Sequence, residues 1–130
     1  KGNYSEKNPL FPINNYAWSK LGGEASVQMY QNSLILRACM TERPFVHKKA
    51  FANVRSNFIF HEDMVGILFK LIDQKGVINI GGKTSTIYNF AKKNNRNIEK
   101  IYWNTNTTNF PKNPSMNLNK LNKIFFKKTL

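Results

Sequence analysis

The chain has 130 residues and a mass of 15.1 kDa, and its 20 Lys and Arg against 7 Asp and Glu give a formal net charge of +13. This length suits one domain with a hydrophobic core. Hydrophobic residues make up 41% and aromatic residues 13%, which excludes a disordered polycation, because such a chain would be poor in both. The single cysteine, Cys39, excludes an internal disulfide framework and a zinc cluster of thiolates within one chain.

The apolar stretches of the sequence are short. One of the longest, residues 65–72, is interrupted by Gly66 and Lys70 and falls short of a membrane span. Residues 1–6 contain no initiator Met and no apolar stretch, so they do not resemble a signal peptide. We therefore predict a cytoplasmic protein without a membrane partner.

The positive charge comes mainly from lysine, with sixteen Lys and four Arg. Nucleic-acid recognition favours the planar guanidinium of Arg, and the lysines occur in scattered pairs such as Lys48-Lys49, Lys92-Lys93 and Lys127-Lys128. We predict a solvated basic surface, and a basic nucleic-acid-binding module is the remote alternative.

The first predicted elements are a helix and a strand. The prolines of residues 8–12 favour an extended approach to a helix over residues 16–31, capped by Asn14 or Asn15. Gly22-Gly23 costs this helix about 1 kcal/mol per Gly relative to Ala, which is tolerable where another backbone approaches closely. The apolar run at residues 34–36 predicts a strand buried on both faces in a parallel sheet.

The middle of the chain predicts alternating elements. Residues 47–54 suit one or two helical turns, and residues 57–60 suit a short strand. Acidic residues in the first turn favour a helix over residues 61–73, and residues 77–80 suit a second buried strand. The apolar stripe of the helix consists of Met64, Ile67, Leu68, Leu71 and Ile72.

The last third continues the alternation. A helix over residues 86–93 could be capped by Ser85 or Thr84, residues 98–103 suit a strand, and residues 105–114 suit a polar loop. The final amphipathic helix has apolar residues at Leu118, Leu121, Ile124 and Phe125. The order of elements is typical of an α/β fold. Since no strand precedes the first helix, a truncated domain fits better than a complete one.

Tyr16 and Lys20 form a Tyr-x-x-x-Lys pair. On a helix, this spacing places the phenol and the ammonium on one face. An ammonium stabilises a phenolate, so the phenol can donate a proton to a carbonyl oxygen as a hydride reaches the carbon. The spacing alone is weak evidence, because Tyr88 and Lys92 repeat it in a place where a half-buried aromatic residue is the simpler interpretation.

A longer string around the first pair resembles a known family. Residues 12–24 read Pro-Ile-Asn-Asn-Tyr-Ala-Trp-Ser-Lys-Leu-Gly-Gly-Glu and resemble the catalytic-helix signature of extended short-chain dehydrogenase/reductases. Within that family they are most similar to the dTDP-4-dehydrorhamnose reductase group. Further segments resemble motifs of the same group in the same order, at residues 1–6, 34–37, 61–65, 76–82 and 111–118.

The resemblance implies the C-terminal part of a Rossmann-type α/β fold with most of the substrate-binding lobe, the N-terminal dinucleotide-binding half being missing. Residues 1–38 would hold the catalytic helix and the next strand. Residues 39–130 would be mainly substrate lobe, with a sheet strand near residues 77–80. The implied activity is NAD- or NADP-dependent reduction of a nucleotide-sugar, with the missing half and the nucleotide-sugar as partners. A nucleotide-sugar epimerase or dehydratase, or a non-catalytic regulatory subunit, is the alternative.

The resemblance also implies roles for individual residues. Tyr16 would be the general acid/base, and Lys20 would stabilise its phenolate and bind the nicotinamide ribose hydroxyls. Arg37, at the carboxyl end of a strand, could contact the cofactor or form a structural salt bridge. Glu24 is expected to be an ion-pair partner at the surface or an interface. A homodimer through the catalytic helix would explain why Gly22-Gly23 are small.

The chain departs from the family pattern in ways that limit what it can do alone. It contains no Gly-x-x-Gly-x-x-Gly turn for the cofactor phosphates, and the family's catalytic Ser/Thr would precede Lys1. Phe110 stands where the family has an Arg, and residues 38–40 lack the usual aromatic residue. We predict no turnover by the isolated chain.

Other reactive side chains favour structural interpretations. His47 and His61 do not follow a zinc-ligand spacing with Glu62 and Asp63, so no metal site is predicted. Cys39 is expected to be a small core residue.

Overall fold

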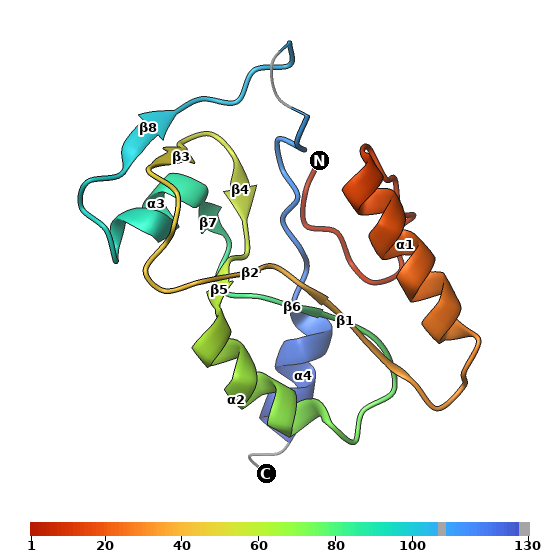
Figure 1. Cartoon of the computed structure of the whole chain (residues 1–130). Coiled ribbons are helices and arrows are strands. Elements are labelled where there is room, and N and C mark those ends of the chain that lie inside the picture. Colours follow the sequence, from red (N-terminus) through yellow and green to blue (C-terminus); the bar gives the residue numbers. More distant parts are fainter. Residues whose placement is uncertain (107–108, 128–130) are drawn as a thin grey trace.

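The computed structural model describes residues 1–106 and 109–127 (Figure 1). Its central element is a parallel pair of strands, β1 (Leu34–Ala38) and β6 (Gly76–Ile80). Their register runs from Leu34 opposite Gly76 to Ala38 opposite Ile80. Both strands were predicted from short apolar runs, and their parallel pairing is confirmed. The predicted burial of the first strand on both faces is wrong: residues 34–37 are only partly buried and Ala38 is exposed, because among the described residues β1 pairs with one strand alone.

Two helices share one face of this sheet. They are α2 (His61–Leu71) and α4 (Asn119–Lys127), and both were predicted. Glu62 and Asp63 lie in the first turn of α2, where they complement the helix dipole. The core beneath the two helices consists of Met64, Leu71, Ile78, Ile80 and Leu121. These contacts confirm most of the predicted stripe, although Leu68 and Ile72 are exposed.

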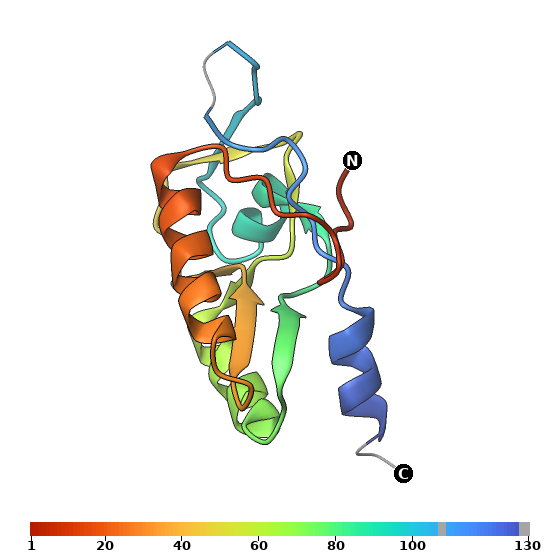
Figure 2. The same ribbon diagram turned by 90° about the vertical axis from the view of Figure 1, so that its right-hand side faces the viewer.

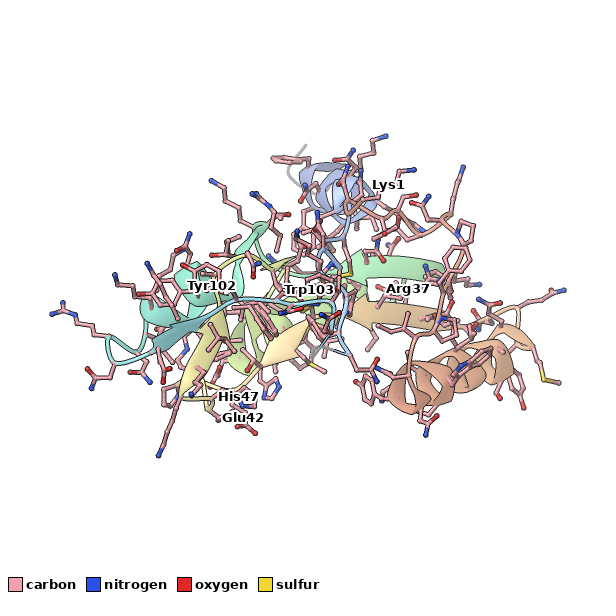
Figure 3. The ribbon with its side chains drawn as sticks, turned by 90° about the horizontal axis from the view of Figure 1, so that it is seen from above. Lys1, Arg37, Glu42, His47, Tyr102 and Trp103 are labelled. Carbon is pink, nitrogen blue, oxygen red and sulfur yellow. The ribbon has the colours of Figure 1, made fainter. Side chains whose placement is uncertain are left out.

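The opposite face carries α1 (Asn15–Gln28). The Asn14 side chain caps this helix by accepting a hydrogen bond from the Ala17 backbone N–H at 2.8 Å. The helix ends three residues earlier than predicted, and none of its residues is buried. Seen from the side and from above, α1, the sheet and α4 form successive layers (Figures 2 and 3).

A second, smaller core lies at the other end of the molecule. β3 (Lys49–Phe51) pairs in parallel with β8 (Glu99–Ile101), α3 (Ile87–Lys92) packs against β3, and β4 (Arg55–Ser56) pairs antiparallel with β7 (Ser85–Thr86). The core residues are Phe45, Ala50, Val54, Ile87, Ala91 and Ile98.

This lobe corrects two predictions. Residues 47–54 are not helical, because pairing with β8, some fifty residues later, holds Lys49–Phe51 extended. The cap of α3 is Thr86 and not Ser85 or Thr84, since the Thr86 hydroxyl accepts from the Asn89 N–H at 3.1 Å. The strand predicted at residues 98–103 is confirmed as β8. Residues 107 and 108 of the expected polar loop lie outside the described residues, as does Lys128.

Two buried asparagines join distant segments. Asn57 lies beside β5 (Ile59–Phe60), which pairs with β2 (Met40–Thr41). Its side chain binds Gly82, Thr84 and Met116. Asn79 of β6 donates to the carbonyl oxygens of Tyr4 and Asn117. The N-terminal residues are thereby fixed against residues 115–117, over the carboxyl end of the sheet.

No helix in the described part of the chain is long and apolar enough to cross a membrane.

Candidate active site

Tyr16 and Lys20 lie one turn apart on the same face of α1, as their spacing predicts. The Lys20 ammonium nitrogen is 5.3 Å from the centroid of the Tyr16 ring. The Tyr16 side chain is 70% exposed, so its hydroxyl is accessible to a ligand. Both side chains line a pocket of about 300 Å³ whose other walls include Leu10, Phe11 and Pro12. The Asn14 cap fixes where the helix begins, and hence where the pair stands relative to these walls.

Arg37 and Glu24 form a bidentate ion pair, and Glu24 lines the same pocket as Tyr16 and Lys20. The Arg37 Nη2 and Nε atoms donate to the Glu24 carboxylate at 2.6 and 3.0 Å, and Nη1 donates to the Glu6 carbonyl oxygen at 3.2 Å. The side chains are 19% and 11% exposed. The structural salt bridge that the sequence left open for Arg37 is therefore present. A contact between Arg37 and a cofactor stays a prediction.

We expect Glu24→Ala to lower the free energy of unfolding by about 2 kcal/mol, because it leaves a mostly buried guanidinium without its carboxylate. The matched control is Glu99→Ala, since Glu99 pairs with Lys49 at 3.3 Å where both side chains are more than half exposed. That exposed pair should contribute at most about 1 kcal/mol. Urea unfolding of the two variants measures the difference, and equal losses would contradict a structural role for the Arg37 pair.

The polar end of the sheet opens into a second pocket of about 320 Å³. It lies at the carboxyl end of β1 and β6, where Arg37 and Asn79 line it, and it shares Leu10 and Phe11 with the Tyr16 pocket. Ligands of open α/β sheets bind at this edge. Arg37 lines this second pocket, and its partner Glu24 lines the Tyr16 pocket. The ion pair therefore contributes to the walls of both pockets.

A larger pocket of about 570 Å³ was not predicted from the sequence. Its aromatic wall includes Phe51 and Phe110, whose rings are stacked with centroids 6.5 Å apart and an interplanar angle of 11°. His47, Lys48 and Lys49 add polar groups to its lining. The sequence feature that could have indicated this pocket is the cluster of aromatic and basic residues within residues 47–54, the segment predicted as helical turns.

The second Tyr-x-x-x-Lys pair belongs to the small lobe. Tyr88 is half-buried and packs against its core, as predicted. The ammonium nitrogens of Lys92 and Lys100 lie 5.6 and 4.9 Å from its ring centroid. The same spacing therefore serves packing here and an open pocket at Tyr16.

Cys39 is half-buried in the link between β1 and β2, with its Sγ 3.0 Å from the Ser56 hydroxyl. Burial raises the pKa of the Cys39 thiol, and hydrogen bonds from Ser56 and the Asn57 backbone offset only part of this effect. A thiol in this state is a weak nucleophile at neutral pH. Within residues 1–106 and 109–127, no three His, Cys, Asp or Glu side chains gather as metal ligands.

The comparisons with known proteins bear on this arrangement. No protein-family model and no curated protein matches the chain. Among solved structures, it is similar to a hypothetical dTDP-4-dehydrorhamnose reductase from Sulfolobus tokodaii, with 23% identity and a TM-score of 0.78 over 95% of this chain and 53% of that one. The reductase from Bacillus anthracis in complex with NADP gives 19% identity and a TM-score of 0.74, over 93% and 52% of the two chains.

The chain has the fold of these reductases over about half of their length. A third reductase, from Yersinia enterocolitica, agrees with 21% identity and a TM-score of 0.62 over 91% of this chain and 50% of that one. The predicted α/β fold class is therefore confirmed, and the coverage is consistent with a fragment. The division at residue 38 and the roles of Tyr16, Lys20 and Arg37 stay predictions.

Proposed function

We propose that this chain is part of an NAD- or NADP-dependent nucleotide-sugar reductase of the dTDP-4-dehydrorhamnose reductase type. The observation that supports it best is the exposed Tyr16 hydroxyl with the Lys20 ammonium over its ring, in a pocket of a chain with a reductase fold. A fold by itself does not specify chemistry. The pair supplies the acid/base group that carbonyl reduction requires.

Tyr16 acts as the proton donor in this proposal. A substrate carbonyl in the pocket accepts a hydrogen bond from the Tyr16 hydroxyl, and the proton transfers to the carbonyl oxygen as the carbon is reduced. Lys20, one turn away, stabilises the phenolate that remains. The opening beside Leu10 and Phe11 admits a ligand to both groups.

The residues fit the nicotinamide end of a cofactor. Tyr16 and Lys20 are both exposed, and the nearby Glu24 carboxylate is bound by Arg37, so Glu24 does not compete for the Lys20 ammonium. Lys20 would hold the ribose hydroxyls. A bound nicotinamide supplies the hydride. The sequence has no Gly-rich turn for the phosphates, so residues 1–130 would hold only part of the cofactor.

The nucleotide-sugar would extend from Tyr16 towards the pocket at Phe51 and Phe110. This pocket combines aromatic walls with His47 and two lysines, which suit a ligand carrying both a ring and negative charge. In Figure 3, His47 lies on the same side of the sheet as α1.

The test measures loss of NADPH absorbance with dTDP-4-dehydrorhamnose. Residues 1–130 alone should show no turnover, because the phosphate-binding turn is absent from them. The polypeptide that also contains a nucleotide-binding half should oxidise NADPH. Interconversion of sugars without net NADPH oxidation would identify an epimerase, and failure of the complete polypeptide to bind NADPH would favour a regulatory subunit.

We also propose that α1 forms a homodimer interface in the complete enzyme. A Cβ atom added at Gly22 or at Gly23 meets no atom within 4 Å, so the small residues leave an open surface on an exposed helix. Gly66 of α2 is equally open and provides the control.

In residues 1–130, Gly22→Ala and Gly66→Ala should each raise the free energy of unfolding by about 1 kcal/mol, because alanine favours a helix interior. In the complete enzyme, Gly22→Ala should weaken the dimer in analytical ultracentrifugation, and Gly66→Ala should not. A dimer unaffected by Gly22→Ala would contradict the interface.

A further inference from the structure

Glu24 is the charged residue on the side of α1 that faces the sheet (Figure 2). The half-buried residues of the helix are Ala17, Leu21 and Glu24, which recur at helical spacing and mark that side, while its other residues are exposed. The Glu24 side chain is only 11% exposed. Because its carboxylate is largely removed from water, it needs a cation or hydrogen-bond donors beside it.

Two cationic side chains are placed to serve this carboxylate. Arg37 of β1 reaches it from the sheet, with Nη2 and Nε at 2.6 and 3.0 Å from its two oxygens. Lys20 lies one helical turn before Glu24, and side chains four residues apart are neighbours on a helix surface. Lys20 and Glu24 also line the same pocket. The partner that Glu24 takes therefore affects what Lys20 can do.

The Lys20 ammonium is directed to Tyr16, where its nitrogen is 5.3 Å from the ring centroid. Arg37 occupies both oxygens of Glu24, and the Gln28 side-chain amide donates to Oε1 at 3.1 Å. A planar guanidinium binds both oxygens of a carboxylate at once, which a single ammonium does not. Glu24 thus has its donors without Lys20.

Arg37 is itself held from the side away from α1. Its Nη1 donates to the Glu6 carbonyl oxygen at 3.2 Å, and the Glu6 carboxylate accepts from the Asn79 N–H of β6 at 3.0 Å. These contacts fix the guanidinium relative to the sheet. Because α1 has no buried residue, the ion pair with Glu24 is a main link between this helix and the sheet.

We propose that Arg37 is a positioning residue, which holds the Glu24 carboxylate away from Lys20 and thereby leaves the Lys20 ammonium with Tyr16. Without the guanidinium, the largely buried carboxylate would have no cation and would take Lys20, one turn away, as its partner. Lys20 would then leave the Tyr16 ring. The effect on turnover rests on the proposed reductase function, whereas the arrangement of the side chains does not.

Nuclear magnetic resonance of the complete polypeptide tests the arrangement without an assay of activity. The Lys20 side-chain protons should show a ring-current shift from Tyr16 and nuclear Overhauser contacts with its ring. Both signals should disappear in Arg37→Met and return in the double variant Arg37→Met/Glu24→Gln, in which no carboxylate attracts Lys20. Signals that persist in Arg37→Met, or that do not return in the double variant, overturn the proposal.

Arg43→Met is the matched control. Arg43 also pairs with a carboxylate, that of Asp63 at 3.1 Å, but neither residue lines the Tyr16 pocket. This variant should leave the Lys20 signals unchanged. Equal changes in Arg37→Met and Arg43→Met overturn the proposal, because they would show a general effect of removing an arginine.

Turnover gives a second measurement if the complete polypeptide is a reductase. Arg37→Met should lower kcat by about 10-fold, a part of the 10²- to 10⁴-fold that a positioned general acid supplies. The double variant should recover to within about 3-fold of the parent, since the two substitutions act on one contact. A double variant as impaired as Arg37→Met overturns the proposal. A parent without turnover whose Lys20 signals change as expected would disprove the proposed function and leave the positioning role intact.

If Arg37→Met does not fold, Arg37→Lys replaces it in both measurements. A lysine keeps the positive charge but lacks the fork that binds both carboxylate oxygens. The contacts between Lys20 and Tyr16 should therefore weaken in Arg37→Lys and recover in Arg37→Lys/Glu24→Gln. Contacts of full strength in Arg37→Lys overturn the proposal.

Discussion

If the proposed reductase function is right, Tyr16→Phe in the complete polypeptide should lower kcat by about 10²- to 10⁴-fold, the usual contribution of a positioned general acid. The substitution removes only the hydroxyl, and the ring that lies 5.3 Å from the Lys20 ammonium remains. Because Tyr16 is 70% exposed and contributes nothing to either core, the fold should be unchanged. Steady-state NADPH oxidation measures kcat and KM, and circular dichroism verifies the fold.

Tyr88→Phe is the matched control for this experiment. Tyr88 has the same spacing to a lysine and the same cation over its ring, but it packs against the core of the small lobe. Since Tyr88 does not line the Tyr16 pocket, its loss of a hydroxyl should leave kcat unchanged. If Tyr16→Phe retained full activity, the assignment of the proton donor would be wrong. Equal losses in both variants would indicate a structural effect.

The sequence predicted the elements whose signals are local. The helix at residues 61–73 has an acidic first turn and an apolar stripe, and the parallel strands at residues 34–36 and 77–80 are continuous apolar runs. The Tyr16–Lys20 pair was predictable for the same reason, because a helix brings residues four apart together without help from tertiary structure.

The remaining features depend on contacts between residues far apart in the sequence. β3 is a strand because it pairs with β8, and its own residues suit a helix as well. The aromatic pocket requires Phe51 and Phe110 to meet across the small lobe. Arg37 and Glu24 are thirteen residues apart on different elements. The sequence indicated a salt bridge for each residue, but it did not identify the two as partners.

Asn57 is the clearest case of a residue whose importance the sequence does not reveal. Its side chain, in a residue only 1% exposed, joins three segments. The carbonyl oxygen accepts from the Met116 N–H at 2.7 Å, and the amide donates to the Gly82 carbonyl and the Thr84 hydroxyl at 2.9 and 3.0 Å. A Cβ atom at Gly81 would lie 2.5 Å from the Asn57 carbonyl oxygen, so the segments are in close contact.

Asn57→Ala should therefore lower the free energy of unfolding by about 3 kcal/mol, because it leaves partly buried donors and acceptors of three segments without their partner, at about 1 kcal/mol each. Urea unfolding measures this loss, and Asn89→Ala, at an exposed position of α3, should change stability by less than about 0.5 kcal/mol. If Asn57→Ala does not fold, Thr84→Val removes one of the three contacts and should cost about 1 kcal/mol. A loss below about 1 kcal/mol for Asn57→Ala would mean that water replaces the amide and that the three segments do not depend on it.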